Sequence, residues 1–282
     1  EISACLVGSE MCIRDRFSVV RLSKIYRQAE SSHIVLNAHK INAGELITLN
    51  NKNKDFFFFE KQDVRSVMGA LIYLVKTKLP EYIGTSPFEI QVLTPMRKGE
   101  LGVEHLNEVL QYYLNPASES KKEKEGRTGV FREGDKVMQV KNNYKLEWKI
   151  TNAKGFSVEE GLGVFNGDMG VIKQINTYSE RITVVFDENR EVEYPYSNLD
   201  ELELAYAITI HKSQGSEYPA VVLPLLSGPP ILCNRNLLYT AITRAQKCAA
   251  IVGRQSMVEQ MIHNETEQKR YSGLNECLKD GI

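Results

Sequence analysis

The sequence predicts an α/β protein in which a small β-barrel interrupts a parallel sheet flanked by helices. Two stretches, residues 17–128 and 203–269, alternate short apolar runs with amphipathic helical patterns. Strands and helices that alternate at this spacing imply a parallel sheet covered on both faces. Between them, residues 129–202 carry several short alternating runs separated by turn residues, which is typical of an antiparallel barrel.

The first α/β stretch consists of predicted strands and helices in alternation. In chain order they are a strand in FSVVRL, a helix in SSHIVLNAHKINAGE, a strand in KDFFFFEK, a helix over residues 62–79, a strand in FEIQVLTP and a helix in VEHLNEVLQYYLN. The first helix places Ile34, Ala38 and Ile41 on one face. We expect serines to cap its start and Gly44 to end it.

The middle of the chain loses this pattern. The run NPASESKKEKEGRTG is polar and charge-dense, so we expect a mobile, solvated surface loop there. Barrel strands are expected in DKVMQVK, NGDMGVIKQI, RITVVF and EVEYPY, with a hairpin turn at residues 187–190.

The second α/β stretch has predicted strands in LELAYAITI, SEYPAVVLPLL and KCAAIVG, a helix in QSMVEQMI, and a tail over residues 270–282. A further helix, over residues 234–246, places Leu238, Ala241, Ile242 and Ala245 on one face. Arg244 lies one step off this stripe. Its stem can therefore pack at the margin of the buried face while its guanidinium reaches outward.

Composition excludes several classes of protein. The net charge of −1 excludes a global basic field, so any nucleic-acid contact must come from a local groove. Five scattered cysteines without a CxxC pair favour reduced thiols in the cytoplasm over disulfides or a zinc site. The apolar run AVVLPLL is too short to span a bilayer, so no membrane partner is expected.

Residues 1–16, EISACLVGSEMCIRDR, fit poorly with the rest of the chain. The short apolar patch lacks a preceding basic flank, so it does not predict a signal peptide. We expect these residues to be a non-native leader, in which case the natural protein extends further upstream.

Polar residues gather in AYAITIHKSQGSEY, directly after a predicted strand. Ligands of open parallel sheets bind at the carboxyl ends of strands, so a site is expected here. The residues present are phosphate and sugar donors with one carboxylate, namely Thr209, His211, Lys212, Ser213, Gln214, Gly215 and Glu217. The alternative is an ordinary polar turn. Because neither cysteines nor further histidines lie nearby, no metal site is expected.

Two arginine-bearing segments add to this pattern. Arg27 and Gln28 follow a predicted strand and precede a helix, and Arg244 ends NLLYTAITR. The planar arginine fork suits phosphate oxygens and cannot lose its charge, although a surface salt bridge would explain either arginine alone.

Together, the segments LSKIYRQAESSHIVLNAHKIN, YAITIHKSQGSEY and NLLYTAITRAQ resemble motifs IV, V and VI of the second motor domain of superfamily 1 helicases. The resemblance is closest to the RecD-like DNA helicases of the 5′-to-3′ branch, and it extends from Phe17 to the C-terminus. It implies a RecA-like domain 2A, in two parts over residues 17–128 and 203–269, and an inserted SH3-like barrel over residues 129–202.

The resemblance also implies roles for single residues. In this family, ATP lies between two RecA-like domains and the second domain contributes arginines. Arg27 and Arg244 would act on the γ-phosphate, and Gln28, Gly215 and Glu217 would line the nucleotide. The DNA contacts would be Thr209, His211, Lys212, Ser213 and Gln214. The barrel residues Lys141, Tyr144, Lys145 and Trp148 are candidates for the single-stranded DNA track, unless the aromatics are core and the lysines a solvated rim.

The sequence contains no G-x-x-x-x-G-K-[ST] motif, so ATP and Mg²⁺ are expected to be held mainly by an upstream RecA-like domain. We therefore expect the chain alone to be inactive as an ATPase. The expected function is that of the C-terminal motor half of an ATP-dependent DNA helicase in repair or recombination. The alternatives are a relaxase-type or RNA-directed superfamily 1 helicase, and a non-catalytic nucleic-acid-binding module.

Overall fold

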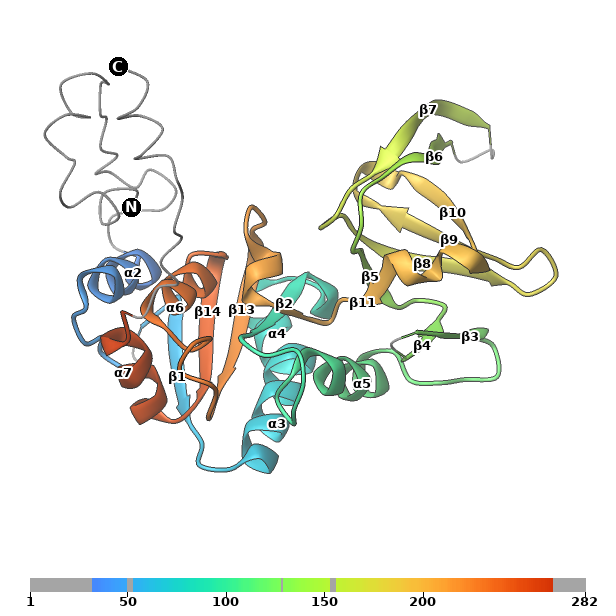
Figure 1. Ribbon diagram of the computed structural model, residues 1–282. Helices are drawn as coiled ribbons and strands as arrows, with labels where there is room; N and C mark the ends of the chain where they lie inside the picture. The colour runs from blue at the N-terminus through green and yellow to red at the C-terminus, as the bar shows by residue number, and fades with distance from the viewer. Residues whose placement is uncertain (1–31, 50–52, 128, 153–155, 266–282) are drawn as a thin grey trace, which may run out of the picture.

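The structure, a computed structural model, describes residues 32–49, 53–127, 129–152 and 156–265. Within them, a five-stranded parallel sheet and a seven-stranded antiparallel sheet occupy different ends of the molecule (Figure 1). The predicted fold class is therefore confirmed. The strand expected in FSVVRL and the tail over residues 270–282 lie outside the described residues.

The parallel sheet has the strand order β1-β14-β13-β2-β12, and every neighbouring pair is parallel. Its strands are β1 (Phe56–Glu60), β2 (Ile90–Thr94), β12 (Ala207–Thr209), β13 (Tyr218–Leu225) and β14 (Ala245–Gly253). β1 lies at the edge of the sheet, so Phe56 and Phe58 are buried while Phe57 and Phe59 are partly exposed.

Helices cover both faces of this sheet. One face carries α2 (His33–Ala43), α6 (Arg235–Ile242) and α7 (Gln255–His263), and the other carries α3 (Val64–Tyr73) and α5 (Val103–Leu114) (Figure 1). Successive side chains of β13 point alternately to the two faces of the sheet. Val221 and Leu223 join the core beneath α2, α6 and α7, whereas Ala220 and Val222 join the core beneath α3 and α5.

The start of α2 differs from the prediction. Gly44 ends the helix in the left-handed conformation, with φ 76°, as expected. Ser32 precedes the helix but does not cap it with its side chain. Instead, the Ser32 hydroxyl donates to Oδ2 of Asp55 at 2.6 Å, which fixes the helix to the residue before β1.

The helix predicted over residues 62–79 is present and longer. Asp63 caps it by accepting a hydrogen bond from the backbone N–H of Ser66 at 2.9 Å. After α3 the chain passes through a π-helical segment (Leu74–Lys78) and α4 (Leu79–Ile83). Gly84, with φ 66°, ends the run.

The antiparallel sheet has the strand order β11-β5-β8-β9-β10-β6-β7. Its strands are β5 (Lys136–Gln139), β6 (Asn143–Thr151), β7 (Ser157–Val164), β8 (Met169–Asn176), β9 (Arg181–Phe186), β10 (Glu191–Pro195) and β11 (Leu202–Leu204). Short 3₁₀ helices lie at Pro87–Glu89, Asp187–Asn189 and Tyr196–Glu201. β5, β8, β9, β10 and the hairpin turn at residues 187–190 are confirmed, whereas β6 and β7 were not predicted.

Two predicted segments are wrong. Part of the expected surface loop forms a two-stranded hairpin, β3 (Glu123–Gly126) and β4 (Gly129–Arg132), in which glutamates and lysines alternate along β3. The single strand expected in LELAYAITI is two strands, because β11 pairs with β5 of the antiparallel sheet and β12 pairs with β2 of the parallel sheet. The chain therefore crosses between the sheets at Ala205 and Tyr206.

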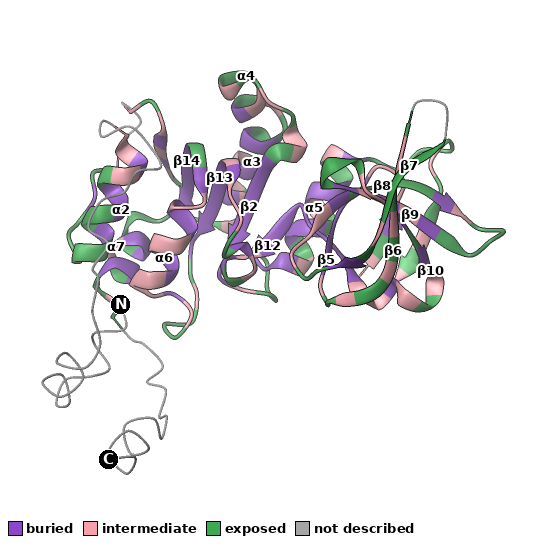
Figure 2. Ribbon diagram, turned by 90° about the horizontal axis from the view of Figure 1, so that it is seen from above, coloured by how far each residue is buried: buried purple, intermediate pink, exposed green. Residues whose placement is uncertain are grey.

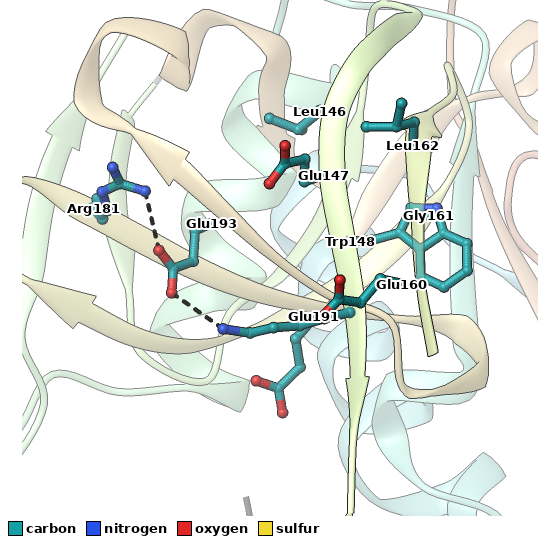
Figure 3. A pocket seen from close by; sticks show the side chains of 10 residues that line it. Leu146, Glu147, Trp148, Glu160, Gly161, Leu162, Arg181, Glu191 and Glu193 are labelled. Carbon is teal, nitrogen blue, oxygen red and sulfur yellow. Dashed lines mark hydrogen bonds and ion pairs between the residues drawn. The ribbon is translucent and has the colours of Figure 1, made fainter. Parts of the chain in front are cut away.

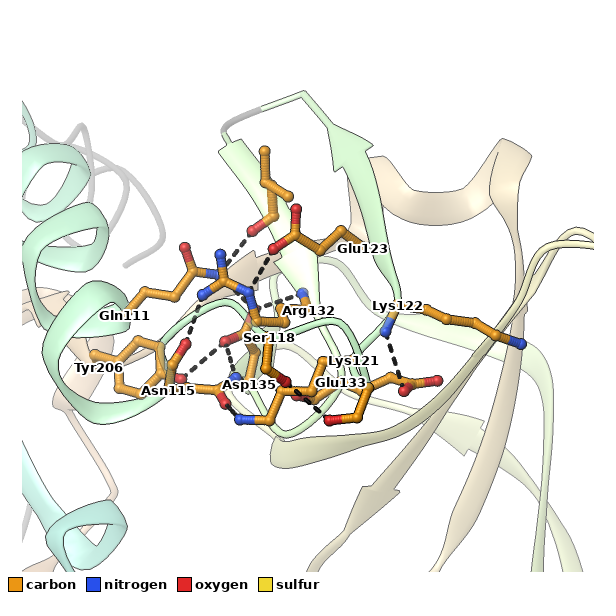
Figure 4. A network of polar contacts seen from close by, with 12 residues as sticks. Gln111, Asn115, Ser118, Lys121, Lys122, Glu123, Arg132, Glu133, Asp135 and Tyr206 are labelled. Atoms are coloured by element: carbon orange, nitrogen blue, oxygen red, sulfur yellow. Dashed lines mark hydrogen bonds and ion pairs between the residues drawn. The ribbon is translucent and has the colours of Figure 1, made fainter.

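A buried carboxylate joins the two sheets near this crossing (Figure 4). Asp135 is fully buried and accepts hydrogen bonds from Gln111 Nε2 at 2.6 Å and Asn115 Nδ2 at 2.7 Å, both on α5 or at its end. It also accepts from the Tyr206 hydroxyl at 2.9 Å and the Arg132 backbone N–H at 2.6 Å. Burial raises the pKa of the Asp135 carboxyl above its ordinary value, and these donors oppose that shift.

The next residue extends this junction into the parallel sheet. Lys136 of β5 is buried, and its ammonium donates to the carbonyl of Phe88 at 2.6 Å and to Gln91 Oε1 at 2.9 Å. Gln91 lies on β2 and donates in turn to the carbonyls of Ala205 and Tyr206 at 3.1 and 3.2 Å. Burial lowers the pKa of Lys136 to about 8.

Candidate functional site

Three of the predicted nucleotide-facing residues, Gly215, Glu217 and Arg244, lie together at one edge of the parallel sheet. Tyr218 begins β13 and Ala245 begins β14, and the two are register partners in parallel strands. Gly215–Glu217 and Arg244 directly precede these two strands, so they lie at the amino edge of the sheet.

This edge is opposite to the one the sequence suggested. We expected the polar run at the carboxyl ends of strands, where Thr209 does end β12. Thr209 is the register partner of Thr94, at the end of β2, whereas Ala220 is the register partner of Ile90, at the start of β2. The chain therefore runs back along the sheet between β12 and β13. Residues 210–217 therefore span from the carboxyl edge to the amino edge.

Arg244 lies in the turn between α6 and β14. The helix ends at Ile242, not at residue 246 as predicted, and Ala245 belongs to the strand. The Arg244 guanidinium donates to the carbonyls of Thr240 at 3.2 Å and Ser216 at 3.1 Å, and to the Thr243 hydroxyl at 3.3 Å. Among the described residues, it forms no ion pair with a carboxylate.

These contacts hold the guanidinium without neutralising it. The acceptors are two carbonyls and one hydroxyl, and the side chain is half-buried. The charge of Arg244 therefore stays available to an anion at this edge. The hydrogen bond to the Ser216 carbonyl also connects Arg244 directly to the Gly215–Glu217 turn.

Gly215 and Glu217 complete this edge. Gly215 has φ 88°, a left-handed conformation that favours glycine, and a Cβ built there would meet no atom within 4 Å. The backbone is thus open to a ligand that approaches closely. Glu217 accepts a hydrogen bond from Gln246 Nε2 at 3.1 Å, which links the starts of β13 and β14.

The predicted DNA contacts form a short 3₁₀ turn, η6 (Ile210–Ser213), at the carboxyl edge. The Thr209 hydroxyl caps this turn by accepting from the Lys212 backbone N–H at 3.4 Å. His211 and Gln214 are exposed. Ser213 is fully buried and its hydroxyl donates to the Ile210 carbonyl at 2.7 Å, so in this conformation the side chain shapes the turn and cannot contact a ligand.

Lys212 belongs to a charge cluster that the sequence did not suggest. Its ammonium lies 3.1 Å from Oε2 of Glu203, a buried carboxylate of β11. The same carboxylate lies 2.6 Å from Arg97 Nη2 and 3.7 Å from Arg127 Nη2. Burial by itself raises the pKa of Glu203, but the hydrogen bond from Arg97 and the charge of Lys212 outweigh it and hold the pKa below its ordinary value.

The remaining candidate residues are Arg27, Gln28 and four residues of the barrel. Arg27 and Gln28 lie outside the described residues. On the barrel, Lys141 is paired with Asp200, and the exposed Tyr144 packs edge-on against Phe165 with ring centroids 5.6 Å apart. Lys145 is exposed as well, whereas Trp148 is half-buried in a separate groove.

Sequence reasoning missed several residues that shape the site. Thr240, Thr243 and Ser216 hold Arg244, and Glu203 holds Lys212. The spacing of Thr240 and Arg244, one helical turn apart, could have indicated the first contact. A glutamate within the apolar run LELAYAITI could have indicated a buried ion pair.

Two features are absent from the described part of the chain, a cluster of metal ligands and a membrane-spanning helix. No group of three or more histidine, cysteine, aspartate or glutamate side chains there is placed to hold a metal ion. None of its helices combines the length and the apolar character needed to cross a membrane.

Comparison with known proteins places this geometry in a family. Residues 106–186 match the family described as the ATP-dependent RecD-like DNA helicase SH3 domain. Residues 204–252, which contain both the η6 turn and Arg244, match the UvrD-like helicase C-terminal domain. The chain thus contains the SH3 domain of RecD-like DNA helicases and a UvrD-like helicase C-terminal domain. The SH3 match starts within α5 and ends before β10, so the domain boundaries at residues 129 and 202 stay predictions.

Individual RecD-like relatives agree with this assignment. The chain is 34% identical over 227 residues to the ATP-dependent RecD2 DNA helicase of Deinococcus radiodurans, covering 80% of the chain and 27% of that protein. It is 30% identical over 191 residues to the RecBCD enzyme subunit RecD of Mycolicibacterium smegmatis, covering 68% of the chain and 29% of that protein. The chain thus spans less than a third of the length of either relative.

Among solved structures, the chain is similar to the Pif1 helicase from Bacteroides in complex with ADP-AlF3 and ssDNA. The TM-score is 0.48 at 19% identity, over 94% of this chain and 57% of that one.

Proposed function

We propose that this chain is the second motor domain and SH3-like barrel of an ATP-dependent DNA helicase that moves along single-stranded DNA and unwinds duplex in repair or recombination. The observation that carries the proposal is the convergence of the Gly215–Glu217 turn and Arg244 at the starts of two neighbouring parallel strands, β13 and β14. A guanidinium held by carbonyls at an exposed edge is suited to a phosphate presented by another domain.

The nucleotide edge fits ATP with Mg²⁺ as cofactors. Arg244, together with Arg27 by resemblance, would stabilise negative charge on the γ-phosphate, and Gln28, Gly215 and Glu217 would line the nucleotide. The upstream RecA-like domain would hold the phosphates and Mg²⁺, which supply the reacting group and neutralise its charge. This chain's own contribution is positioning: Thr240, Thr243 and Ser216 orient the arginine before a nucleotide arrives.

The DNA strand would cross at the carboxyl edge of β12. His211 and Gln214 are exposed there, and Thr209 caps the turn. The Lys212 ammonium adds a positive charge, although it also pairs with Glu203. Contacts of this kind reach the sugar–phosphate backbone and carry little sequence information. We expect binding to single-stranded DNA that is insensitive to sequence and weakens as salt is raised.

The experiment uses the D. radiodurans relative as a carrier. The chain alone is expected to show no ATP hydrolysis above background. A chimera in which the chain replaces the matching segment of that relative should hydrolyse ATP when single-stranded DNA is added. Hydrolysis by the chain alone that requires Arg244 would overturn the two-domain arrangement, and a folded chimera without activity would overturn the motor role.

The alternatives carry less support. A relaxase-type or RNA-directed helicase would share the η6 and Arg244 segments, but the SH3 match is to RecD-like DNA helicases. A module that only binds nucleic acid would not need an arginine held free of carboxylates at the amino edge. A cytoplasmic location is part of the proposal, and the buried free thiols of Cys233 and Cys248 are compatible with it.

A further inference from the structure

The far end of the barrel carries a groove that the motor function does not use (Figure 3). Its volume is about 560 Å³, and strands β6, β7, β9 and β10 line it. Its apolar part consists of Leu146, Trp148 and Leu162, of which Leu162 is 65% exposed. Trp148 lies on the opposite face of the β6–β7 pair from Leu162, because its register partner is Gly161 and successive residues of a strand alternate between faces.

The position of Trp148 depends on a glycine. Gly161 is its register partner on β7, and a Cβ on Gly161 would lie 2.3 Å from Cζ2 of the indole. The absence of a side chain at Gly161 therefore lets the indole lie across β7. The Arg190 guanidinium lies 5.9 Å from the ring centroid.

The rim of the groove is acidic. Four glutamates line it, Glu147, Glu160, Glu191 and Glu193, against two cations, Lys149 and Arg181. Glu193 is paired with Arg181 at 3.1 Å and with Lys149 at 3.8 Å, and Glu191 is paired with the neighbouring Lys173 at 2.5 Å, so the excess negative charge is that of Glu147 and Glu160. Within the described residues, Glu147 and Glu160 form neither an ion pair nor a hydrogen bond through their side chains.

β7 also offers an edge. It is the last strand of the antiparallel sheet, and in the described part of the chain its outer edge has no strand partner. Edge strands are commonly protected by lysine or proline, and β7, SVEEGLGV, contains neither. Val158, Glu160 and Leu162 alternate on one of its faces, and both apolar residues are more than half exposed. Figure 2 shows β7 as mostly exposed and β6 as a mixture of exposed and half-buried residues.

We propose that this groove docks a protein segment that is extended and alternates basic with apolar residues, with lysines or arginines reaching Glu147 and Glu160 on the face that carries Leu162, and apolar side chains reaching Trp148 on the other face of the β6–β7 pair. The charge of the rim selects the partner. A nucleic-acid backbone would bring further negative charge against unpaired carboxylates, whereas a basic segment removes their repulsion. An extended segment can also pair along the free edge of β7. The Trp148 surface is thereby separated from the DNA track, for which the sequence made it one candidate.

The test uses the single tryptophan of the chain as a reporter. The probe is the peptide Lys-Leu-Lys-Phe-Lys-Leu-Lys with blocked ends, and its counterpart has glutamate in place of lysine. Trp148 emission should change and saturate with the lysine peptide and stay constant with the glutamate peptide. The double variant E147Q/E160Q should weaken binding about tenfold, because it removes the two unpaired charges.

Two further variants distinguish a loss of specific charges from a loss of folding. E100Q/E119Q removes two exposed charges elsewhere and should leave the affinity unchanged. Leu162→Ser should weaken binding without changing the unfolding midpoint, because the side chain is already 65% exposed.

Three results would overturn the proposal. One is equal binding of the lysine peptide to the wild type and to E147Q/E160Q, or no binding at all. Another is a Trp148 response to oligothymidylate that strengthens in E147Q/E160Q, which would assign the groove to nucleic acid. The third is an emission change caused by protein concentration alone, which would assign it to a second copy of the chain. None of these outcomes depends on ATP hydrolysis.

Discussion

The edge at Arg244 and the junction at Asp135 hold a charged side chain in opposite ways. Arg244 is half-buried, and its guanidinium contacts are 3.1–3.3 Å long and come from residues close to it in the sheet edge. Asp135 is fully buried, and its four donors lie at 2.6–2.9 Å and come from three separate parts of the chain. The charge of Arg244 is open to an external anion, whereas the carboxylate of Asp135 is fully hydrogen-bonded within the protein.

The difference indicates what each region is for. A carboxylate with four short donors and no exposure can only stabilise the fold, because no external group can reach it. An arginine held by carbonyls keeps its full charge, so its interaction energy is largest with an anion from outside. Loss of Arg244 should therefore affect activity and not stability, and loss of Asp135 should do the reverse.

The largest expected effect is on activity. In the chimera, Arg244→Ala should lower DNA-stimulated ATP hydrolysis at least about 10³-fold, the effect typical of an arginine that stabilises a phosphoryl transition state. Steady-state hydrolysis measures it, and the unfolding midpoint should change little. The matched control is Arg181→Ala, since Arg181 is already paired with Glu193 and should leave the rate within about twofold. An Arg244→Ala chimera that keeps a tenth of the rate would contradict the comparison.

Asp135→Ala should have the largest effect on stability. Gln111, Asn115 and Tyr206 would lose a buried acceptor, and we expect about 4 kcal/mol of unfolding free energy to be lost. Urea denaturation of the 282-residue chain measures this loss. Asp200→Ala, which removes the partner of Lys141 at the surface, should cost less than about 1 kcal/mol. Similar losses for the two variants would show that the junction does not stabilise the fold.

Lys136 adds a pH dependence at the same junction. Burial lowers the pKa of its ammonium to about 8 in the folded chain, from 10.5 in the unfolded chain. Between these values the unfolded chain binds more protons, so stability should rise with pH from about 8 to 10.5, by at most about 3 kcal/mol. Lys136→Met should remove this rise, and the difference between the two stability curves isolates it from tyrosine and other lysine titrations. Parallel curves would mean that the Lys136 ammonium is not desolvated.

The fold was largely predictable because its signals are local. Residues 62–79 repeat apolar side chains at helical spacing, and the β2 strand is apolar at most positions, so each element follows from its own sequence. The β3–β4 hairpin and the long β6–β7 pair were missed. Their residues are mostly polar and exposed, and what specifies them is pairing between strands, which short-range patterns do not report.

The roles of the site residues stay predictions, and the edge of the sheet expected for the polar run was only partly right. Gly215 and Glu217 were selected by type and by family resemblance, yet the carboxyl-end rule placed them on the wrong side of the sheet. The rule fails because the segment after Thr209 returns along the sheet before β13 starts, and this depends on the register of β12 and β13 against β2. Glu203 was missed for a similar reason, since its partner Arg97 lies more than a hundred residues away in the sequence.

Glu203 lies between the two cases and gives the smallest expected effect. Its carboxylate is buried like Asp135, but its partners Arg97 and Lys212 are cations near the proposed DNA track. Glu203→Gln should free part of their charge, so oligothymidylate should bind about threefold more tightly at low salt, with a salt slope steeper by about 0.7 for one added phosphate contact. Fluorescence anisotropy over a series of salt concentrations measures both quantities. Glu104→Gln is the control, because Glu104 contacts Arg97 from an exposed position and leaves Lys212 untouched. Weaker binding with an unchanged slope would instead mean that Glu203 positions Lys212 for DNA, so that the cluster belongs with the Arg244 edge and not with the Asp135 junction.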